Sequence, residues 1–387
     1  MSSMEQLLSS DIRLTDYSIE IVEVPFHHPV HLPFGTIKTR PSAWLKVYGQ
    51  VDGAHGQGAA EGTSLPMQIP MYDDYSGNLA ANIDHLMAPL NVAHYTLREA
   101  RATIAATDLG GNYATARMTV ETSLIDLAAR SQGMTVYEML SGEPLDAPLA
   151  IPYGKSIAEN DYEDIVAAGV QAVSNGAQRL KFKLSPKNHA AVVRGISDLQ
   201  AMNPDASFMV DANGTFDPEN LDHIAILHTV DQLGLMMIEE PVSRGGRLSG
   251  LVAHRALGQA IRLETPVALD DSISTYQDAQ TALHEGLGEI INLKPGRVGS
   301  FLDCVDMADL AAEQGRQIMV GGMFEATPGR TMTLTLAALC LKQGFAIPGD
   351  VSLPQERLAG DLTQTNLRLD EQYNVTFAPK SGWGYML

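Results

Sequence analysis

The sequence predicts an α/β protein that contains a (β/α) barrel, with an α+β segment before it and a tail after it that returns to that segment. From about Leu149, short apolar runs alternate with helical stretches at near-constant spacing, which is the pattern of βα units with parallel strands. Earlier in the chain strands are followed by helices, and the final residues alternate between apolar and polar again. We therefore expect three segments: an α+β capping segment at 1–145, a barrel at 146–355 and a returning tail at 356–387.

The composition narrows the class of protein. A chain of 387 residues is too long for one small core, and its net charge of −20 argues against nucleic acid or an anionic membrane surface as partner. Two cysteines form no disulfide framework and favour a reducing compartment. The start lacks a signal peptide, and no apolar run is long enough to span a membrane. We expect a soluble, cytoplasmic protein that attracts an anionic substrate only through local positive charge.

The N-terminal segment shows strand patterns and then a helical one. Residues 15–26 alternate between apolar and polar, and residues 42–62 read as a hairpin that turns at Asp52 and Gly53. Residues 115–142 carry apolar residues at helical spacing, and glycines follow. Strands followed by helices predict an α+β unit that ends near residue 142.

Seven apolar runs then follow one another. They are LAIPYGKS, QRLKFKLS, SFMVDANG, GLMMIEEP, TPVALDDS, EIINLKPG and RQIMVGGMFE. The residues at their ends recur every 24 to 31 positions, about the length of a βα unit, so a barrel is favoured over an open sheet. Barrel enzymes place their chemistry at the carboxyl ends of the strands, so the residues at those ends are the candidates for function.

Three carboxylates stand at the ends of consecutive strands: Asp211, Glu239 and Asp270. Each alone could be a helix N-cap. Three of them converging on one mouth would repel each other without a cation. Carboxylate ligands with open positions suit Mg²⁺, with Mn²⁺ as a substitute. These strand ends carry no His or Cys, which argues against zinc. The sequence therefore predicts a magnesium site.

Lysines flank the carboxylates. Lys181 and Lys183 lie two residues apart in one strand and so share a face; the alternative is that they protect an exposed sheet edge. Lys183 precedes the first acidic strand and Lys294 follows the third, so the two would face each other across a metal-bound substrate. This arrangement suits removal of the proton α to a carboxylate, because the metal stabilises the resulting enediolate.

The motifs KFK, DAN, IEEP, LDDS, NLKPGRVG and GGMFE resemble the enolase superfamily, in its muconate-lactonizing subgroup. The resemblance covers nearly the whole chain, since the N-terminal segment and the tail are similar to the capping domain of that family. Within the subgroup, NLKPGRVG and the text from Gly321 to Glu325 look most like o-succinylbenzoate synthases and N-succinylamino acid racemases.

The resemblance implies a role for each of the strand-end residues. Lys183 and Lys294 would be the acid/base pair, supported by Lys181, and the three carboxylates would bind Mg²⁺. It also implies a small-molecule carboxylate as substrate, a homo-oligomer, and a capping-domain loop at Val30 to Thr36 that covers the site. Glu325 is expected on the eighth strand. The implied substrate-binding residues are Asn213, Glu325, Met323, Gly322 and Ser156.

Two reactions follow from the resemblance. A synthase would dehydrate a cyclohexadiene carboxylate to o-succinylbenzoate, and a racemase would exchange the α-proton between two lysines. Both need the same lysines, so the lysines do not distinguish them. The alternatives are a cycloisomerase, a dipeptide epimerase or a non-catalytic barrel that binds a carboxylate. An epimerase is expected to carry Asp-x-Asp on the eighth strand, where we expect MFEA in this chain, and a muconate-type enzyme is expected to carry Asp in place of Glu325.

The chain departs from the family pattern at two places. After Glu325 the family usually runs Thr-Gly-x-Gly-Arg, whereas this chain has the residues from Ala326 to Arg330, with Pro328 among them. We expect this proline to change the loop beside the pocket. Lys155 adds a positive charge near the end of the first barrel strand. Two arginines, Arg179 and Arg297, are expected to pair with surface acids; the alternative is that they bind a substrate carboxylate.

Overall fold

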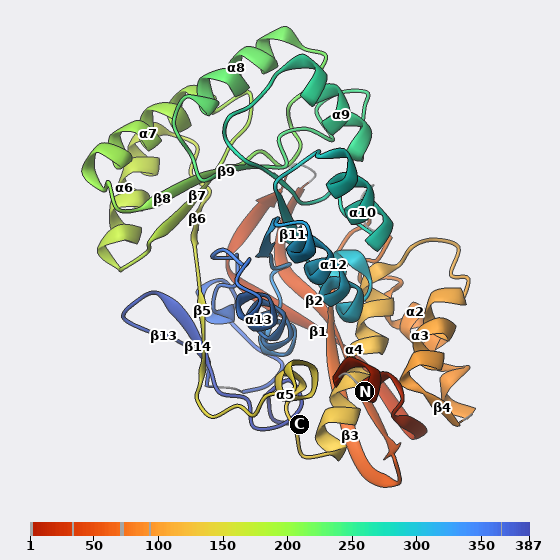
Figure 1. The fold of residues 1–387 in the computed structure, drawn as a ribbon. Helices are drawn as coiled ribbons and strands as arrows, with labels where there is room; N and C mark the ends of the chain where they lie inside the picture. The colour runs from red at the N-terminus through yellow and green to blue at the C-terminus, as the bar shows by residue number, and fades with distance from the viewer. Residues whose placement is uncertain (1–2, 33–34, 70–72, 93, 365) are drawn as a thin grey trace.

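The computed structural model describes residues 3–32, 35–69, 73–92, 94–364 and 366–387. A long antiparallel sheet with its helices forms one part of the molecule, and a curled parallel sheet surrounded by helices forms the other (Figure 1). The last strands run back beside the start of the parallel sheet. The structure thus has the predicted order of strands, helices, βα units and returning tail.

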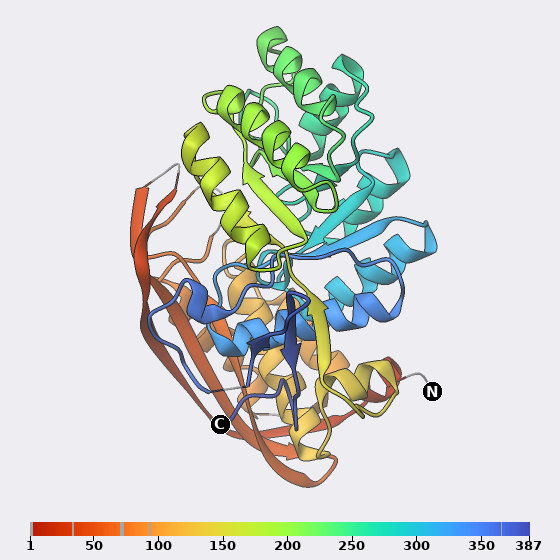
Figure 2. The ribbon, with the colours of Figure 1, turned by 90° about the vertical axis from the view of Figure 1, so that its left-hand side faces the viewer.

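The first part is built on a four-stranded sheet in the order β3-β2-β1-β4. Asp52 and Gly53 turn between the second and third strands with φ of 51° and 84°, as a two-residue hairpin requires, so the predicted hairpin is confirmed. Figure 2 shows the long β1–β2 hairpin along one edge of the molecule. The elements are β1 (Asp11–Leu32), β2 (Gly35–Val51), β3 (Ala54–Thr63), β4 (His94–Thr96), α1 (Ser3–Leu8), α2 (Leu79–Met87), a 3₁₀ turn (Leu90–Val92), α3 (Leu97–Ala106), α4 (Ala114–Ser131) and α5 (Val136–Ser141).

Seven parallel strands, from β6 to β12 in sequence order, form the barrel sheet. The strands are β6 (Lys155–Ile157), β7 (Arg179–Lys183), β8 (Ser207–Asp211), β9 (Met237–Glu239), β10 (Val267–Leu269), β11 (Ile290–Leu293) and β12 (Gln317–Val320). The helices are α6 (Tyr162–Ser174), α7 (His189–Met202), α8 (Leu221–Asp231), α9 (Gly250–Ala260), α10 (Tyr276–Glu285), α11 (Pro295–Val298), α12 (Phe301–Glu313) and α13 (Thr327–Lys342).

Residues 345–350 take the eighth position of the barrel. Ala346 bridges Ile318 of β12, and Gly349 bridges Tyr153, just before β6, both in parallel. The inside of the barrel below the mouth is apolar, since the fully buried side chains of Met209, Met237, Ala268, Ile290 and Met319 pack together there. The polar groups at the mouth of the barrel therefore lie above a buried apolar layer.

The tail joins both parts of the molecule. Its hairpin, β13 (Arg368–Leu369) and β14 (Asn374–Phe377), follows a 3₁₀ turn (Pro354–Glu356) and pairs with β5 (Leu149–Pro152). The Tyr385 hydroxyl then donates to the carbonyl of Ala59 in β3, and the backbone N–H of Trp383 donates to Asp126 in α4. The division of the chain at residues 145 and 355 stays a prediction.

Buried carboxylates of the capping segment cap two barrel helices. Glu61 of β3 accepts hydrogen bonds from the backbone N–H groups of Ala326 and Gly329 at the start of α13. Glu121 of α4 does the same for Phe301 at the start of α12. Carboxylates satisfy the free N–H groups of a helix N-terminus and complement its dipole, so these two contacts fix how the parts meet.

Candidate active site

Five of the predicted chemical residues lie at the carboxyl ends of the barrel strands, and Lys181 lies two residues earlier on β7. Lys183, Asp211 and Glu239 are the last residues of β7, β8 and β9. Asp270 and Lys294 come directly after β10 and β11. The strand order places the three acidic strands between the two lysine strands, so one edge of the sheet carries lysine, three carboxylates and lysine in succession.

Each carboxylate contacts a cation. Lys181 Nζ lies 2.6 Å from Glu239 Oε2 and 3.0 Å from Asp211 Oδ2, so it bridges two neighbouring strands. Lys183 Nζ lies 2.6 Å from Asp211 Oδ2, and Lys294 Nζ lies 2.7 Å from Asp270 Oδ2. Lys181 is buried, whereas 37% of the Lys183 side chain is exposed. This rules out a sheet edge for Lys181 and leaves Lys183 open to the mouth.

The charges in this cluster shift one another's pKa. Burial and the facing carboxylate of Asp211 raise the pKa of Glu239 to about 7. Burial acts in the same direction on Asp211, but Lys181 and Lys183 outweigh it and hold the pKa of that carboxyl below its usual range. Burial also opposes the charged form of Lys294, yet Asp270 prevails and raises the pKa of the ammonium. The carboxylates therefore depend on cations to stay ionised side by side.

The donor set fits a divalent metal ion, although the carboxylates are not yet gathered around one point. Within the residues that the structure describes, no three His, Cys, Asp or Glu side chains are placed to hold a metal ion together. Lys181 stands between Asp211 and Glu239 instead. Three buried carboxylates on neighbouring strand ends supply the oxygen donors that Mg²⁺ favours, and the ammonium groups of the lysines contact the same carboxylates.

Two predicted substrate residues face the cluster. Asn213 has a left-handed backbone, with φ of 44°, and its Oδ1 accepts a hydrogen bond from Lys183 Nζ at 2.9 Å. Such strained backbone is concentrated at functional sites. Ser156 lies opposite Lys181 in the parallel pairing of β6 and β7. The structure thus places both residues near the lysines, and their contact with substrate stays a prediction.

The loop after β12 forms another wall. A Cβ atom at Gly321 would lie 2.5 Å from Lys294 Cε, and one at Gly322 would lie 2.7 Å from a guanidinium nitrogen of Arg330. The sulfur of Met323 lies within 2.9 Å of the corresponding position at Gly296. The loop therefore packs closely between Arg330 and Lys294, and glycine is needed for that approach.

The expected position of Glu325 on the eighth strand is wrong. Glu325 follows β12, the seventh strand of the sheet, and residues 345–350 take the eighth position. The error arose because the apolar run at the eighth position is short and resembles a loop in the sequence. The Glu325 side chain is buried and accepts a hydrogen bond from Arg330 at 2.9 Å.

Similarity to known proteins gives the family. Residues 16–141 match the mandelate racemase / muconate lactonizing enzyme N-terminal domain, and residues 164–387 match the enolase C-terminal domain-like family. The chain belongs to the enolase superfamily. It is an enzyme, and the predicted enolase-type α/β fold is confirmed.

Relatives in the superfamily cover most of the chain. An o-succinylbenzoate synthase from Geobacillus kaustophilus is 29% identical over 84% of this chain and 80% of its own length. An N-succinylamino acid racemase from Amycolatopsis is 25% identical over 91% of this chain and 90% of its own. A solved superfamily structure from Listeria innocua has a TM-score of 0.83 and 24% identity, covering 97% of this chain and 95% of that one.

The departures from the superfamily pattern have different outcomes. Pro328 does not disrupt a loop, because α13 begins at Thr327 and proline is favoured in a first helical turn. Lys155 pairs with Glu356 at 2.7 Å. It is therefore a partner of the segment that leads into the tail.

The two arginines do not pair with surface acids. Arg179 is buried and lies 2.7 Å from Asp350, the last residue of the eighth barrel position. Arg297 is buried and contacts Asp270, one of the predicted metal ligands. Both were misjudged because arginine is usually exposed, whereas here each guanidinium neutralises a carboxylate at the barrel mouth.

Sequence reasoning missed three further residues of the site. Asp350 accepts a hydrogen bond from Lys181 at 2.6 Å. Asn292 donates to Glu239 at 2.8 Å, and Glu240 accepts from the backbone N–H of Asp270 at 2.7 Å. Asn292 could have been found, since it lies on β11 two residues before Lys294, which directly follows that strand.

The predicted covering loop is only partly within the described residues. Pro33 and Phe34 of the predicted loop lie outside the described residues, while Phe26 of β1 packs edge-on against Phe324 beside the mouth.

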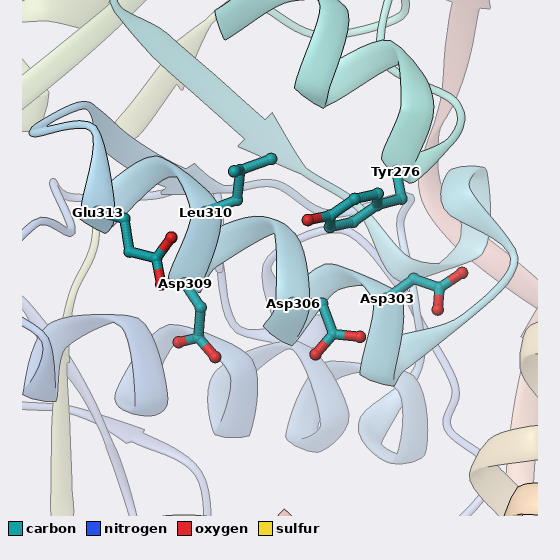
Figure 3. A pocket seen from close by; sticks show the side chains of 6 residues that line it. All are labelled: Tyr276, Asp303, Asp306, Asp309, Leu310 and Glu313. Carbon is teal, nitrogen blue, oxygen red and sulfur yellow. The ribbon is translucent and has the colours of Figure 1, made fainter.

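Figure 3 shows an acidic depression on α12, lined by Tyr276, Asp303, Asp306, Asp309, Leu310 and Glu313. It lies on an outer barrel helix and shares no residue with the strand-end cluster.

Proposed function

We propose that the protein removes the proton α to the carboxylate of a small substrate, as an o-succinylbenzoate synthase, an N-succinylamino acid racemase, or both. The observation that carries this proposal is the order of charges along the barrel edge. Lys183 and Lys294 flank three carboxylates on the strands between them. The names of the relatives support the two specific reactions.

Asp211, Glu239 and Asp270 would hold Mg²⁺, or Mn²⁺ in its place. The ion would neutralise the negative charge that develops on the substrate carboxylate when the α-proton leaves. Asn292 would orient Glu239, to which it donates a hydrogen bond, and Arg297 would orient Asp270.

Lys183 would act as one acid/base group and Lys294 as the other. In the racemase reaction one lysine removes the α-proton and the other delivers a proton to the opposite face. In the synthase reaction the α-proton and a hydroxyl group leave as water. Lys181 would keep Asp211 and Glu239 ionised, because it contacts both. Asn213, Ser156, Gly322, Met323 and Glu325 would line the substrate pocket.

The runner-up reactions of the subgroup are a cycloisomerase and a dipeptide epimerase. The eighth barrel position, where an epimerase is expected to carry Asp-x-Asp, ends at Asp350, and Val351 and Ser352 follow it. Asp350 is already paired with Arg179 and Lys181, so an ammonium group of a dipeptide would find no free Asp-x-Asp pair there. A homo-oligomeric state and a cytoplasmic location stay predictions.

Deuterium exchange at the α-carbon tests the proposal. N-succinyl amino acids are incubated in D₂O with and without Mg²⁺ and followed by NMR, and dehydration of the cyclohexadiene carboxylate is followed by absorbance. We expect Mg²⁺-dependent turnover that falls about 10²- to 10⁴-fold in Lys183→Ala. Lys155→Ala is the matched control, because this lysine pairs with Glu356 instead of the cluster. Full activity of Lys183→Ala would refute the assignment.

A further inference from the structure

Glu61 is a buried carboxylate that the proposed chemistry does not use. It lies on β3 of the capping sheet, 3% exposed. Its Oε1 accepts from the backbone N–H of Ala326 at 2.9 Å and from Ser42 Oγ at 2.8 Å, and its Oε2 accepts from the N–H of Gly329 at 2.9 Å. This carboxylate thus accepts one hydrogen bond from the capping sheet and two from the start of α13, and we call this set of contacts the Glu61 junction.

The first turn of α13 depends on this junction. Asp361 of the tail accepts from the backbone N–H of Thr327 at 2.8 Å, and Pro328 has no N–H to satisfy. Glu61 and Asp361 together therefore satisfy the N–H groups of Ala326, Thr327 and Gly329, which have no backbone partner within the helix.

The first turn of α13 also positions the side chains of Glu325 and Arg330. A Cβ atom at Gly329 would lie 2.8 Å from Glu325 Cβ, so this glycine packs directly on the Glu325 side chain. Arg330 donates one hydrogen bond to Glu325 at 2.9 Å and another to the carbonyl of Asp350 at 3.3 Å. These contacts join the helix start to both the seventh and eighth barrel positions.

The last step leads to the catalytic lysine. The loop from Gly321 to Glu325 is packed between Arg330 and Lys294, since added Cβ atoms at its first two glycines would meet those side chains at 2.7 Å or less. A displacement of the α13 start would therefore move the wall against which the Lys294 side chain lies.

We propose that Glu61 is a positioning residue: it ties the capping sheet to α13 and so sets the loop Gly321–Glu325 against Lys294. The functional part of this inference rests on the proposed role of Lys294 as an acid/base group. The capping sheet thereby holds Lys294 in place without touching the substrate, and Lys183 on β7 lies outside this chain of contacts.

Two variants and one control test the inference. Glu61→Gln keeps the shape but replaces one acceptor oxygen by an NH₂ group, which must face an N–H donor. Glu61→Asp retracts the carboxylate and serves if the glutamine variant does not fold. Glu121→Gln is the matched control, because Glu121 is also a buried capping carboxylate, at 2.6 Å from the N–H of Phe301, but it caps α12.

Amide hydrogen exchange measured by mass spectrometry reads the loop directly. We expect the peptide that covers residues 321–325 to exchange several-fold to about tenfold faster in Glu61→Gln, the range that loss of one hydrogen bond produces. Glu121→Gln should instead affect residues 300–302. Faster exchange at residues 326–329 alone, or the same loop effect in both variants, would overturn the inference.

The ratio of inversion to α-proton exchange in the substrate reports on the role of Lys294. The enantiomer that still exchanges its α-proton in Lys294→Ala is the one that faces Lys183. With that enantiomer, Glu61→Gln should invert the centre several-fold less often per exchange event, because inversion needs Lys294. Loss of folded protein would lower both rates equally and leave the ratio unchanged. An unchanged ratio overturns the link to Lys294. If wild-type protein shows no α-exchange at all, the proposed function fails, and the amide measurement decides the role of Glu61 by itself.

Discussion

The ammonium group of Lys181 lies 2.6 Å from a carboxylate oxygen of Asp350, 169 residues further along the chain. This ion pair joins the second strand of the barrel to its eighth position. Asp350 also pairs with Arg179 at 2.7 Å, so one carboxylate neutralises two buried cations of β7. Lys181 and Lys183 can therefore stand on one strand face, because Asp350 neutralises Lys181 while Lys183 pairs with Asp211.

Replacing this carboxylate should destabilise the protein. In Asp350→Asn, Arg179 stays buried but loses this carboxylate, whereas Lys181 keeps Asp211 and Glu239; breaking a buried pair in this way costs about 3 kcal/mol. Urea unfolding of the two proteins measures the difference in the free energy of unfolding. Glu356→Gln is the control, because its partner Lys155 is 36% exposed and an exposed pair contributes about 1 kcal/mol or less. Equal losses in the two variants would contradict the assignment.

Magnesium should stabilise the protein through the strand-end carboxylates. Protein treated with a chelator and then given Mg²⁺ at about 100 times its Kd should gain about 2.7 kcal/mol. The gain is visible as a rise in Tm by differential scanning fluorimetry. The rise should disappear in Glu239→Gln. It should persist in Asp306→Asn, whose side chain lines the outer acidic depression; loss in that variant instead would place the ion on α12.

The buried Glu61 should make stability depend on pH. Burial is the main cause that raises the pKa of Glu61 from 4.5 to about 7, and the nearby carboxylate of Glu325 adds to it. Between these values the folded protein binds a proton that the unfolded chain has released. The contribution of Glu61 to the free energy of unfolding is therefore complete below pH 4.5 and decreases as pH rises to 7, by at most about 1.4 kcal/mol per pH unit.

Comparison of wild type with Glu61→Gln isolates this contribution. The groups that face Glu61 are the carboxylate of Glu325, the hydroxyl of Ser42 and the backbone N–H groups of Ala326 and Gly329. These remain in the variant, so the difference in slope between pH 5 and 7 belongs to Glu61. Chemical unfolding at several pH values provides the slopes, and parallel curves for both proteins would contradict the prediction.

Pro328 should stabilise the helix start without affecting catalysis. Proline at this position of α13 sacrifices no hydrogen bond and restricts the unfolded chain. We expect Pro328→Ala to lower the free energy of unfolding by about 0.4 to 1 kcal/mol, measured by denaturant unfolding, with an unchanged exchange rate at the α-carbon. A change in substrate preference would restore the view that this proline reshapes the pocket.

Much of the fold was visible in the sequence because parallel strands are apolar on both faces and recur at βα spacing. The Asp52-Gly53 hairpin was equally clear, since the turn residues carry the required positive φ. The eighth barrel position was not predicted. Residues 345–350 make their contacts through isolated bridges to Ile318 and Tyr153, which no local pattern announces.

The site was predictable where chemistry and strand ends coincide, as at Asp211, Glu239 and Asp270. It was not predictable where residues distant in sequence meet. Asp350 carries no local signal, because its partners become neighbours only when the barrel curls. Glu61 is hidden for a related reason, since an acidic residue on a strand reads as solvent-exposed until the start of α13 is seen to lie against it.

The pairing of the tail bears on how the chain folds during synthesis. The hydroxyl of Tyr385 reaches back 326 residues to Ala59, and its ring packs on Trp44 of β2; the indole N–H of Trp383 donates to the carbonyl of Thr122 in α4. While ribosomes are still elongating the barrel, the N-terminal sheet lacks the aromatic side chains that complete its core. We expect that unit to stay incompletely packed until residue 385 has left the exit tunnel.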